Sequence, residues 1–362
     1  MAFLFKRNPK TPSELVRVLN DQVTKLDNTN DLKKVQDDTS RYLSQITVIL
    51  HGDEENVPQP DQISQLAQEV YSTDCLYLLI LNLHNLEFNS RKDVSILFTT
   101  LLRREIGNRN PTVDHLLSKP KILITLLRGP ENSETCLITG AMLRDCIKYE
   151  AITKYLLKEP LIWQYFNYSK NGTFENATDA FITLSDLLTV HKKAVAEFFN
   201  KNLEKFIFHI NNLINLGNYV TKRQAVKLLS QLIMQRSNYH LLQAYVDSPQ
   251  NLKLIMILLS DKSKNLQIEA FNVFKIFIAN PKKSKPILDI LIKNRDKLIT
   301  YLRNFSTDRK ENMREFNDEK EFVIQQIEDL PRLIVSNSNS SVDIPNLPNH
   351  LRQQQQQQQQ QQ

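Results

Sequence analysis

The sequence predicts an all-α fold in which short helical units stack along one axis. A helical pattern recurs five times, and its first small or apolar positions, Val94, Leu137, Ala180, Ala225 and Ala270, are 43, 43, 45 and 45 residues apart. Apolar residues follow each of these positions by three or four residues, the spacing of one helix face. A proline opens an apolar segment at Pro120, Pro160 and Pro249, and the double-length last gap predicts a further copy near Asn202.

A period of about 40 to 47 residues with two or three helices per unit is typical of armadillo and HEAT arrays. One such unit cannot bury its apolar face alone, so neighbouring units stack into a continuous core. We therefore predict a right-handed armadillo/HEAT-like helical-repeat solenoid of about six to seven units. Six glycines among 362 residues leave little material for hairpins and support an all-helical chain.

The elements follow in order from local signals. The first helix is expected to begin at Pro12 or Ser13, and the segment "HGDEENVPQP" breaks the pattern after the second helix. Helices then run from Gln62 to Arg303, and a last helix in "EKEFVIQQIEDL" is expected to end before Pro331.

These signals divide the chain into two domains. Residues 1–335 are predicted to form the helical-repeat scaffold domain. Residues 336–362 are predicted to be a disordered Ser/Asn-rich tail, which ends in ten glutamines and has too little apolar content to offset the entropy of ordering. Either a neutral low-complexity extension or an association-promoting segment would have this composition.

Composition also narrows the class of protein. The three cysteines include no Cys-x-x-Cys pair, so neither a disulfide framework nor a zinc site is indicated. No apolar run approaches the roughly 20 residues that span a bilayer. The apolar patch at the N-terminus is too short for a signal peptide. We expect a cytoplasmic protein without membrane insertion.

Enzyme motifs are missing from the sequence. It contains no Gly-x-Gly-x-x-Gly, no Walker-type loop, no His-Glu-x-x-His and no Gly-x-Ser-x-Gly. The acidic segment "HGDEEN" has neither the spacing nor the length of a calcium loop. We therefore predict a protein that is not an enzyme, with no catalytic residue, no metal site and no cofactor.

The strongest candidate site lies on the helix expected from Tyr219 to Met234. Ala225, Leu228, Leu229 and Leu232 fall on one face, whereas Tyr219, Arg223, Lys227, Ser230 and Met234 fall on the opposite one. Two cations flanked by a tyrosine and a methionine suit a peptide that carries a carboxylate and aromatic or aliphatic anchors. A solvated basic face is the alternative interpretation.

The following units offer similar residues. Lys253 and Met256 lie one turn apart in "NLKLIMILL", and Lys293 could occupy the corresponding face further on. This part of the chain is basic: Leu216 to Thr300 contains 14 Lys or Arg against five Asp or Glu, in a chain of net charge +6. An acidic partner is expected for this stretch.

Aromatic residues gather around the single tryptophan, Trp163, and core packing is the expected role of this cluster. Phe174 differs, because it follows Asn171 and Gly172 on a predicted loop. An aromatic side chain in that position is a candidate for contact with a partner.

Several long stretches carry a specific resemblance. "DVSILFTTLLRREIGNRNPTV", "MLRDCIKYE", "NYVTKRQAVKLLSQLI", "NLKLIMILLSDKSKNLQIEAFNVFKIFIANPKKSKPILDILIKN" and "FNDEKEFVIQQI" resemble the calcium-binding protein 39, or mouse-protein-25-like, scaffold family. The resemblance covers about residues 1 to 335. The tail, together with "ITGAMLRDC" and the Gly172-Thr173 pair before Phe174, departs from the animal pattern and indicates a fungal member.

The resemblance implies a non-enzymatic scaffold that binds and allosterically activates a germinal-centre-type protein kinase and/or a pseudokinase, in a pathway for polarised growth and cell separation. It implies a pocket for a short Trp-Glu-Phe-like C-terminal peptide of the partner, at Arg223, Lys227, Lys253 and Met256. It also implies a concave kinase-facing surface with Phe174 and Arg236. Concentration at growth or division sites would follow from that role, and the family's calcium label finds no ligand motif here.

Two other functions remain open for such a fold. A nucleic-acid-binding helical repeat is favoured by the basic stretch, but readers of this kind carry a regular pair or trio of base-reading side chains in every unit, and none is visible. A transport adaptor would need an asparagine ladder or several groove tryptophans, and the chain has one tryptophan.

Overall fold

The computed structural model describes residues 11–27, 30–305 and 313–331. At residue 313 it describes only the backbone. These residues form α-helices joined by short turns and 3-10 segments, with no β-strand in the described ranges. The chain divides into two compact units, Met1–Lys283 and Ser284–Gln362. The predicted tail, residues 336–362, lies outside the described residues.

The helices follow one another with few interruptions. In chain order they are α1 (Pro12–Val23), α2 (Leu32–His51), α3 (Pro60–Ser72), α4 (Cys75–Leu81), η1 (Leu83–Asn85), α5 (Phe88–Arg103), α6 (Pro111–Ser118), α7 (Lys121–Leu127), η2 (Gly129–Glu131), α8 (Cys136–Ile147), α9 (Glu150–Leu156), η3 (Pro160–Trp163), α10 (Gln164–Tyr168), α11 (Phe174–Thr189), α12 (Lys192–Leu216), α13 (Tyr219–Ile233), η4 (Arg236–Asn238), α14 (Tyr239–Val246), α15 (Pro249–Leu259), α16 (Lys264–Ala279), α17 (Lys285–Arg303) and α18 (Met313–Glu328).

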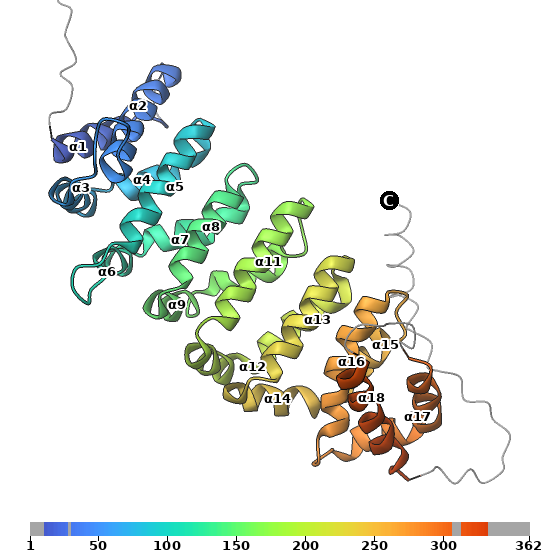
Figure 1. Ribbon diagram of the computed structural model, residues 1–362. Coiled ribbons are helices and arrows are strands. Elements are labelled where there is room, and N and C mark those ends of the chain that lie inside the picture. Colours follow the sequence, from blue (N-terminus) through green and yellow to red (C-terminus); the bar gives the residue numbers. More distant parts are fainter. Residues whose placement is uncertain (1–10, 28–29, 306–312, 332–362) are drawn as a thin grey trace, which may run out of the picture. The chain divides into compact units, whose positions relative to one another are not determined.

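Unit 1 is a stack of helical repeats. The helix pair α1 and α2 comes first, and five repeats follow, which end in α5, α8, α11, α13 and α16. These last helices pack against one another in chain order, beginning on α2, and Figure 1 shows α2, α5, α8, α11 and α13 side by side. We call α2, α5, α8, α11, α13 and α16 the third-helix row. The predicted helical-repeat solenoid is thereby confirmed.

The repeat period follows from small buried residues in the third helices. Val94, Ala180, Ala225 and Ala270 are fully buried, as predicted. Leu137 is 46% exposed, so its assignment to this position is wrong; the buried residue that takes this position in α8 is Thr139, two residues later. Its hydroxyl donates to the carbonyl oxygens of Thr135 (3.1 Å) and Cys136 (3.0 Å), so a polar residue is accommodated in the core.

The copy predicted near Asn202 is present within α12. Asn202 has φ −135° and ψ 23°, which is outside the helical region and divides α12 into two helices. The repeat that ends in α13 therefore also has three helices.

Polar side chains also connect adjacent repeats, on helices of the third-helix row or, for Glu134, just before α8. The bridges include Ser40–Ser90 (2.6 Å), Arg91–Glu134 (3.3 Å), Arg144–Asp179 (2.8 Å) and Arg223–Glu269 (3.5 Å). Gly140 makes room for one of them, because a Cβ at this glycine would lie 2.0 Å from the Asp179 carboxylate. These contacts fix the spacing of the helices that carry the candidate site.

Unit 2 contains the described helices α17 and α18, which pack together. Arg295 is 7% exposed and donates to the carbonyl oxygens of Leu330 (3.1 Å) and Glu328 (2.7 Å), so it caps the end of α18. Lys320 of α18 donates in turn to the carbonyl oxygen of Phe305 (3.4 Å), just beyond α17. Each helix thus binds the other's C-terminal carbonyls.

Candidate functional site

The exposed face of α13 is the centre of the candidate site. Asn218 caps the helix by accepting a hydrogen bond from the backbone N–H of Thr221 (2.9 Å). On the core side Ala225, Leu229 and Leu232 are buried. On the opposite side Tyr219 is 46% exposed, the Arg223 side chain is 43% exposed and Met234, just after the helix, is 61% exposed; Lys227 is also exposed. The predicted two-faced helix is present.

Two residues of this face are held by the next repeat. The Tyr219 hydroxyl accepts a hydrogen bond from Ser263 (3.1 Å), the N-cap residue of α16, and this bond, with one from Asn265, lowers the pKa of Tyr219. Arg223 Nε lies 3.5 Å from Glu269 Oε1, and the Glu269 side chain is only 13% exposed. Ser263 and Glu269 do not stand out in the sequence, because neither interrupts the helical pattern of its own repeat.

The guanidinium of Arg223 stays available at its outer end. Glu269 faces Nε, and no other ion pair or hydrogen bond engages Arg223 among the residues that the structure describes. Nη1 and Nη2 can therefore donate together to an incoming carboxylate, the paired geometry that favours arginine over lysine.

The other predicted pocket residues lie on later helices. Lys253 is exposed and Met256 half-buried on α15, which packs against α16. Ile257, beside Met256, is 54% exposed, although nothing in the helical period marks it as a surface residue. Lys293 is exposed on α17, in unit 2.

Phe174 is exposed as predicted but is not in a loop. It is 62% exposed and is the first residue of α11. The helix starts there because Thr173 is its N-cap and accepts from the N–H of Asn176 (3.3 Å), while Gly172, at φ 96°, allows the sharp turn before it. Arg236 is exposed and begins η4, just after α13.

Other apolar side chains of the third-helix row are exposed as well. Phe88 at the start of α5 is 65% exposed, Ile96 of α5 is 36% exposed and Ile182 of α11 is 44% exposed. Ile96, Ile182 and Lys227 all come two residues after the buried residue that marks each repeat. Aligning the repeats on that residue would have found this position, which is apolar in α5 and α11 and basic in α13.

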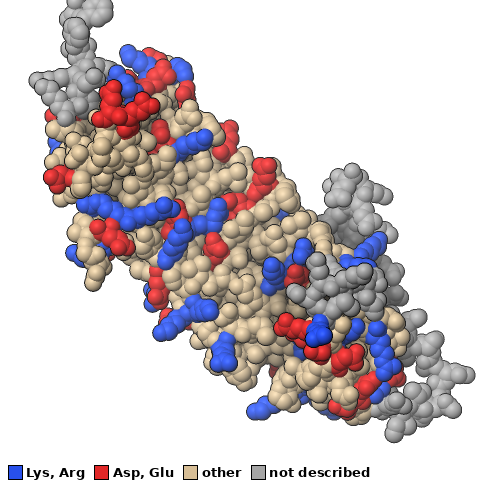
Figure 2. All heavy atoms as spheres, in the orientation of Figure 1, with Lys and Arg blue, Asp and Glu red and all other residues tan. Residues whose placement is uncertain are grey.

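Trp163 belongs to the core. It is 9% exposed and stacks on Phe198 (ring centroids 5.4 Å apart) and His209 (5.1 Å), with Lys205 Nζ 4.5 Å from its ring centre. It does not serve as a groove tryptophan. Figure 2 shows Lys and Arg interspersed with Asp and Glu over the visible face of α1 to α11, rather than a single basic field.

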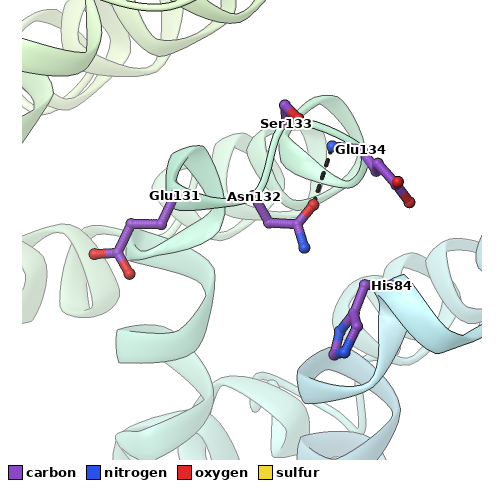
Figure 3. A pocket seen from close by; sticks show the side chains of 5 residues that line it. All are labelled: His84, Glu131, Asn132, Ser133 and Glu134. Carbon is purple, nitrogen blue, oxygen red and sulfur yellow. Dashed lines mark hydrogen bonds between the residues drawn. The ribbon is translucent and has the colours of Figure 1, made fainter.

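A shallow depression of about 440 Å³ lies away from α13. It is lined by His84, Glu131, Asn132, Ser133 and Glu134, and Figure 3 shows the two carboxylates pointing apart. Arg91 already neutralises Glu134 (3.3 Å), and Glu131 accepts from the Tyr168 hydroxyl (3.1 Å). The depression does not gather groups for catalysis or for metal binding.

The fold and the exposed face together define a helical-repeat protein with a mixed basic and aromatic surface on α13. The model of the Mo25-like family matches residues 3–331, and the chain belongs to this family of scaffold proteins. Protein HYM1 of Saccharomyces cerevisiae is 44% identical over 360 residues, covering 94% of this chain and 90% of that protein. A Mo25-like protein of Schizosaccharomyces pombe is 43% identical (91% of this chain, 100% of that protein), and human calcium-binding protein 39-like is 42% identical (91% and 98%).

The name of the human relative raises the question of calcium. In "HGDEEN", Asp53 Oδ1 accepts hydrogen bonds from the backbone N–H groups of Glu55 (2.9 Å) and Asn56 (2.7 Å), so this carboxylate shapes its own turn. Over the described ranges, no group of three or more His, Cys, Asp or Glu side chains is arranged to hold a metal ion. These residues do not fit a calcium site. Within the same ranges, no helix combines the length and the apolar character needed to span a bilayer.

Proposed function

We propose that this protein is a non-enzymatic scaffold that binds and allosterically activates a germinal-centre-type protein kinase and/or a pseudokinase. The observation that carries the proposal is the exposed face of α13, where Arg223 is held by Glu269 with its outer nitrogens available. Membership of the Mo25-like family supports a scaffold role.

The partner peptide is a short C-terminal segment of the Trp-Glu-Phe type. Its glutamate binds Arg223, with Lys227 and Lys253 adding positive potential. Its aromatic residues pack on the exposed surfaces of Tyr219 and Met256. Lys293, the sixth residue that the sequence predicts for this pocket, lies on α17 in unit 2 and stays a prediction.

The kinase domain contacts the third-helix row through Phe174 and, beyond α13, Arg236. Exposed Phe88 and Ile182 extend the apolar part of that row. Activation follows from conformational selection: a kinase whose active conformation is sparsely populated shifts toward it when only that conformation makes these contacts. The scaffold supplies no reacting group. Such a protein acts in the cytoplasm, concentrated at sites of growth or division, in a pathway of polarised growth and cell separation.

Peptide binding tests the first surface. A fluorescent peptide ending in Trp-Glu-Phe should bind the full chain, and Arg223→Ala and Met256→Ala should each weaken it about tenfold or more, as expected for central contacts. Lys192→Ala removes an exposed lysine of α12 and serves as the matched control. With a peptide that carries glutamine in place of glutamate, Arg223→Ala should weaken binding much less. If Lys192→Ala weakened peptide binding as much as Arg223→Ala, the binding would be due to non-specific positive charge and not to this site.

Kinase activation tests the second surface. Phe174→Ala and Arg236→Ala should lower activation of a germinal-centre-type kinase while leaving peptide binding intact. Phe208→Ala is a close control, since Phe208 of α12 is 62% exposed, as Phe174 is, but lies outside the third-helix row. A chain with all four changes, at Arg223, Met256, Phe174 and Arg236, that still bound and activated its kinase would refute the proposal.

Nucleic-acid binding is the rival supported by the basic stretch from Leu216 to Thr300. A gel shift with single- and double-stranded RNA across a salt series separates the two, because phosphate-driven binding falls steeply with salt. RNA that stays bound at moderate salt would favour a nucleic-acid-binding protein. If no RNA binds at moderate salt, this function is excluded.

A further inference from the structure

The turn between α10 and α11 contains the dipeptide Asn171-Gly172 in an open setting. Both residues are exposed, and a Cβ built on Gly172 meets no atom within 4 Å. The Asn171 backbone N–H is bound to the Asn167 carbonyl oxygen (3.0 Å). In the part of the chain that the structure describes, neither the Asn171 carboxamide nor the Gly172 N–H makes a hydrogen bond.

This arrangement suits an intramolecular reaction. The backbone nitrogen of Gly172 attacks Cγ of Asn171, a C–N bond forms, and the carboxamide nitrogen leaves as ammonia to give a five-membered succinimide. Water then opens the ring at either carbonyl, and the product is aspartate or isoaspartate. No oxidant, reductant or enzyme is needed. Glycine favours the first step because it has no side chain to hinder the approach and rotates freely.

A second exposed turn contains Asn132, whose surroundings should slow the same reaction. Asn132 is followed by Ser133, and its side-chain oxygen accepts a hydrogen bond from the N–H of Glu134 (3.0 Å), drawn in Figure 3. That bond restrains the Asn132 carboxamide, whereas the Asn171 carboxamide makes no such bond in the described part of the chain. The side chain of Ser133 adds steric hindrance that Gly172 lacks.

We propose that Asn171 is a site of spontaneous deamidation that alters the start of α11. The turn has little slack, because Asn171 is tied to Asn167 and Thr173 caps α11 through Asn176. Isoaspartate sends the main chain through the β-carbon and adds a backbone atom between these two fixed points. One of them must then give way, and Phe174, the first residue of α11, moves with the cap. The chemistry is independent of the proposed function, whereas an effect on kinase binding rests on it.

Peptide mass spectrometry of the folded full chain, aged in warm and mildly alkaline buffer, tests the chemistry. The fragment containing Asn171 should gain the mass that replaces NH2 by OH several-fold faster than the fragment containing Asn132, with an isoaspartate fraction. Asn171→Gln should remove this conversion, since its longer side chain closes a ring less readily. An intact Asn171 amide in the folded chain, under conditions that convert the urea-unfolded chain, would overturn the proposal.

Hydrogen exchange tests the structural consequence. Amides in the first turn of α11 should exchange several-fold faster in the aged wild type than in the equally aged Asn171→Gln variant, while those of α13 stay unchanged. Equal exchange in the two aged proteins would refute the displacement of the cap. Kinase activation measured on the same samples should fall only in the aged wild type. If fresh protein does not activate the kinase, the proposed function fails while the mass and exchange results stand.

Discussion

Acid should destabilise unit 1 through one buried histidine, His115 of α6. Its side chain is 8% exposed and its ring packs against Tyr71, with 5.0 Å between ring centroids. Burial, helped by the Lys119 charge and opposed by Asp74, lowers the pKa of His115 from 6.5 to about 4. The folded protein therefore holds this ring neutral at a pH where an unfolded chain would protonate it.

The direction and size follow from proton linkage. Because the pKa of the folded state is the lower one, the unfolded state binds more protons between the two values, and stability falls as pH drops below 6.5. Going from pH 7 to pH 5 should cost about 2 kcal/mol, and the full effect, reached below pH 4, is about 3 kcal/mol.

The assay compares wild type with His115→Phe, which keeps an aromatic ring against Tyr71 but cannot titrate. Opening free energies from hydrogen exchange at α6 should fall by about 2 kcal/mol more in wild type than in the variant between pH 7 and pH 5. Other acid-sensitive groups are common to both proteins and cancel in the difference. Equal pH dependence in the two proteins would show that His115 is hydrated or partnered in the folded state, and would refute the reasoning.

Three further predictions follow from single contacts. Gly140→Ala should destabilise unit 1 by about 1–3 kcal/mol in chemical denaturation, because the new methyl group displaces the Asp179 carboxylate; a neutral result would mean that the carboxylate relocates freely. Arg295→Met should speed hydrogen exchange in α18 by an amount equivalent to about 1–3 kcal/mol, since two carbonyl groups lose a donor; unchanged exchange would show that water replaces the cap. In a double-mutant cycle on peptide affinity, Arg223→Ala and Glu269→Gln should couple by about 0.5–1 kcal/mol, and additive effects would indicate that Glu269 does not act through Arg223.

Periodicity predicted the repeat architecture because each third helix must bury a stripe of its own. The prediction of the buried position is correct wherever a small or apolar residue occupies it, as at Ala225 and Ala270. It is wrong in α8, where Thr139 occupies this position. The Thr139 hydroxyl is hydrogen-bonded within the helix, and the apolar residue nearby, Leu137, is exposed. The sequence shows that a side chain is polar, but whether it finds a hydrogen-bond partner within its own helix depends on the backbone geometry.

The same limit applies to the start of α11. Asn171 and Gly172 correctly predict a turn, but the extension of that turn to Phe174 is wrong. Thr173 ends the loop one residue earlier by capping the helix. Threonine is common both in turns and at N-caps, so the sequence alone did not separate the two.

The face of α13 could be found from its sequence, but the state of its arginine could not. Two cations one turn apart repel each other slightly, which by itself favours neither a ligand site nor a solvated surface. The deciding partner, Glu269, belongs to the next repeat and reaches Arg223 only when the repeats stack. Glu269 engages Nε, and no other described residue pairs with the outer nitrogens. Stacking therefore both orients this arginine and preserves its capacity for a carboxylate. The exposed Tyr219 lies on the same face as this oriented arginine, so the face offers aromatic surface as well as charge, and this combination is why we favour the peptide site.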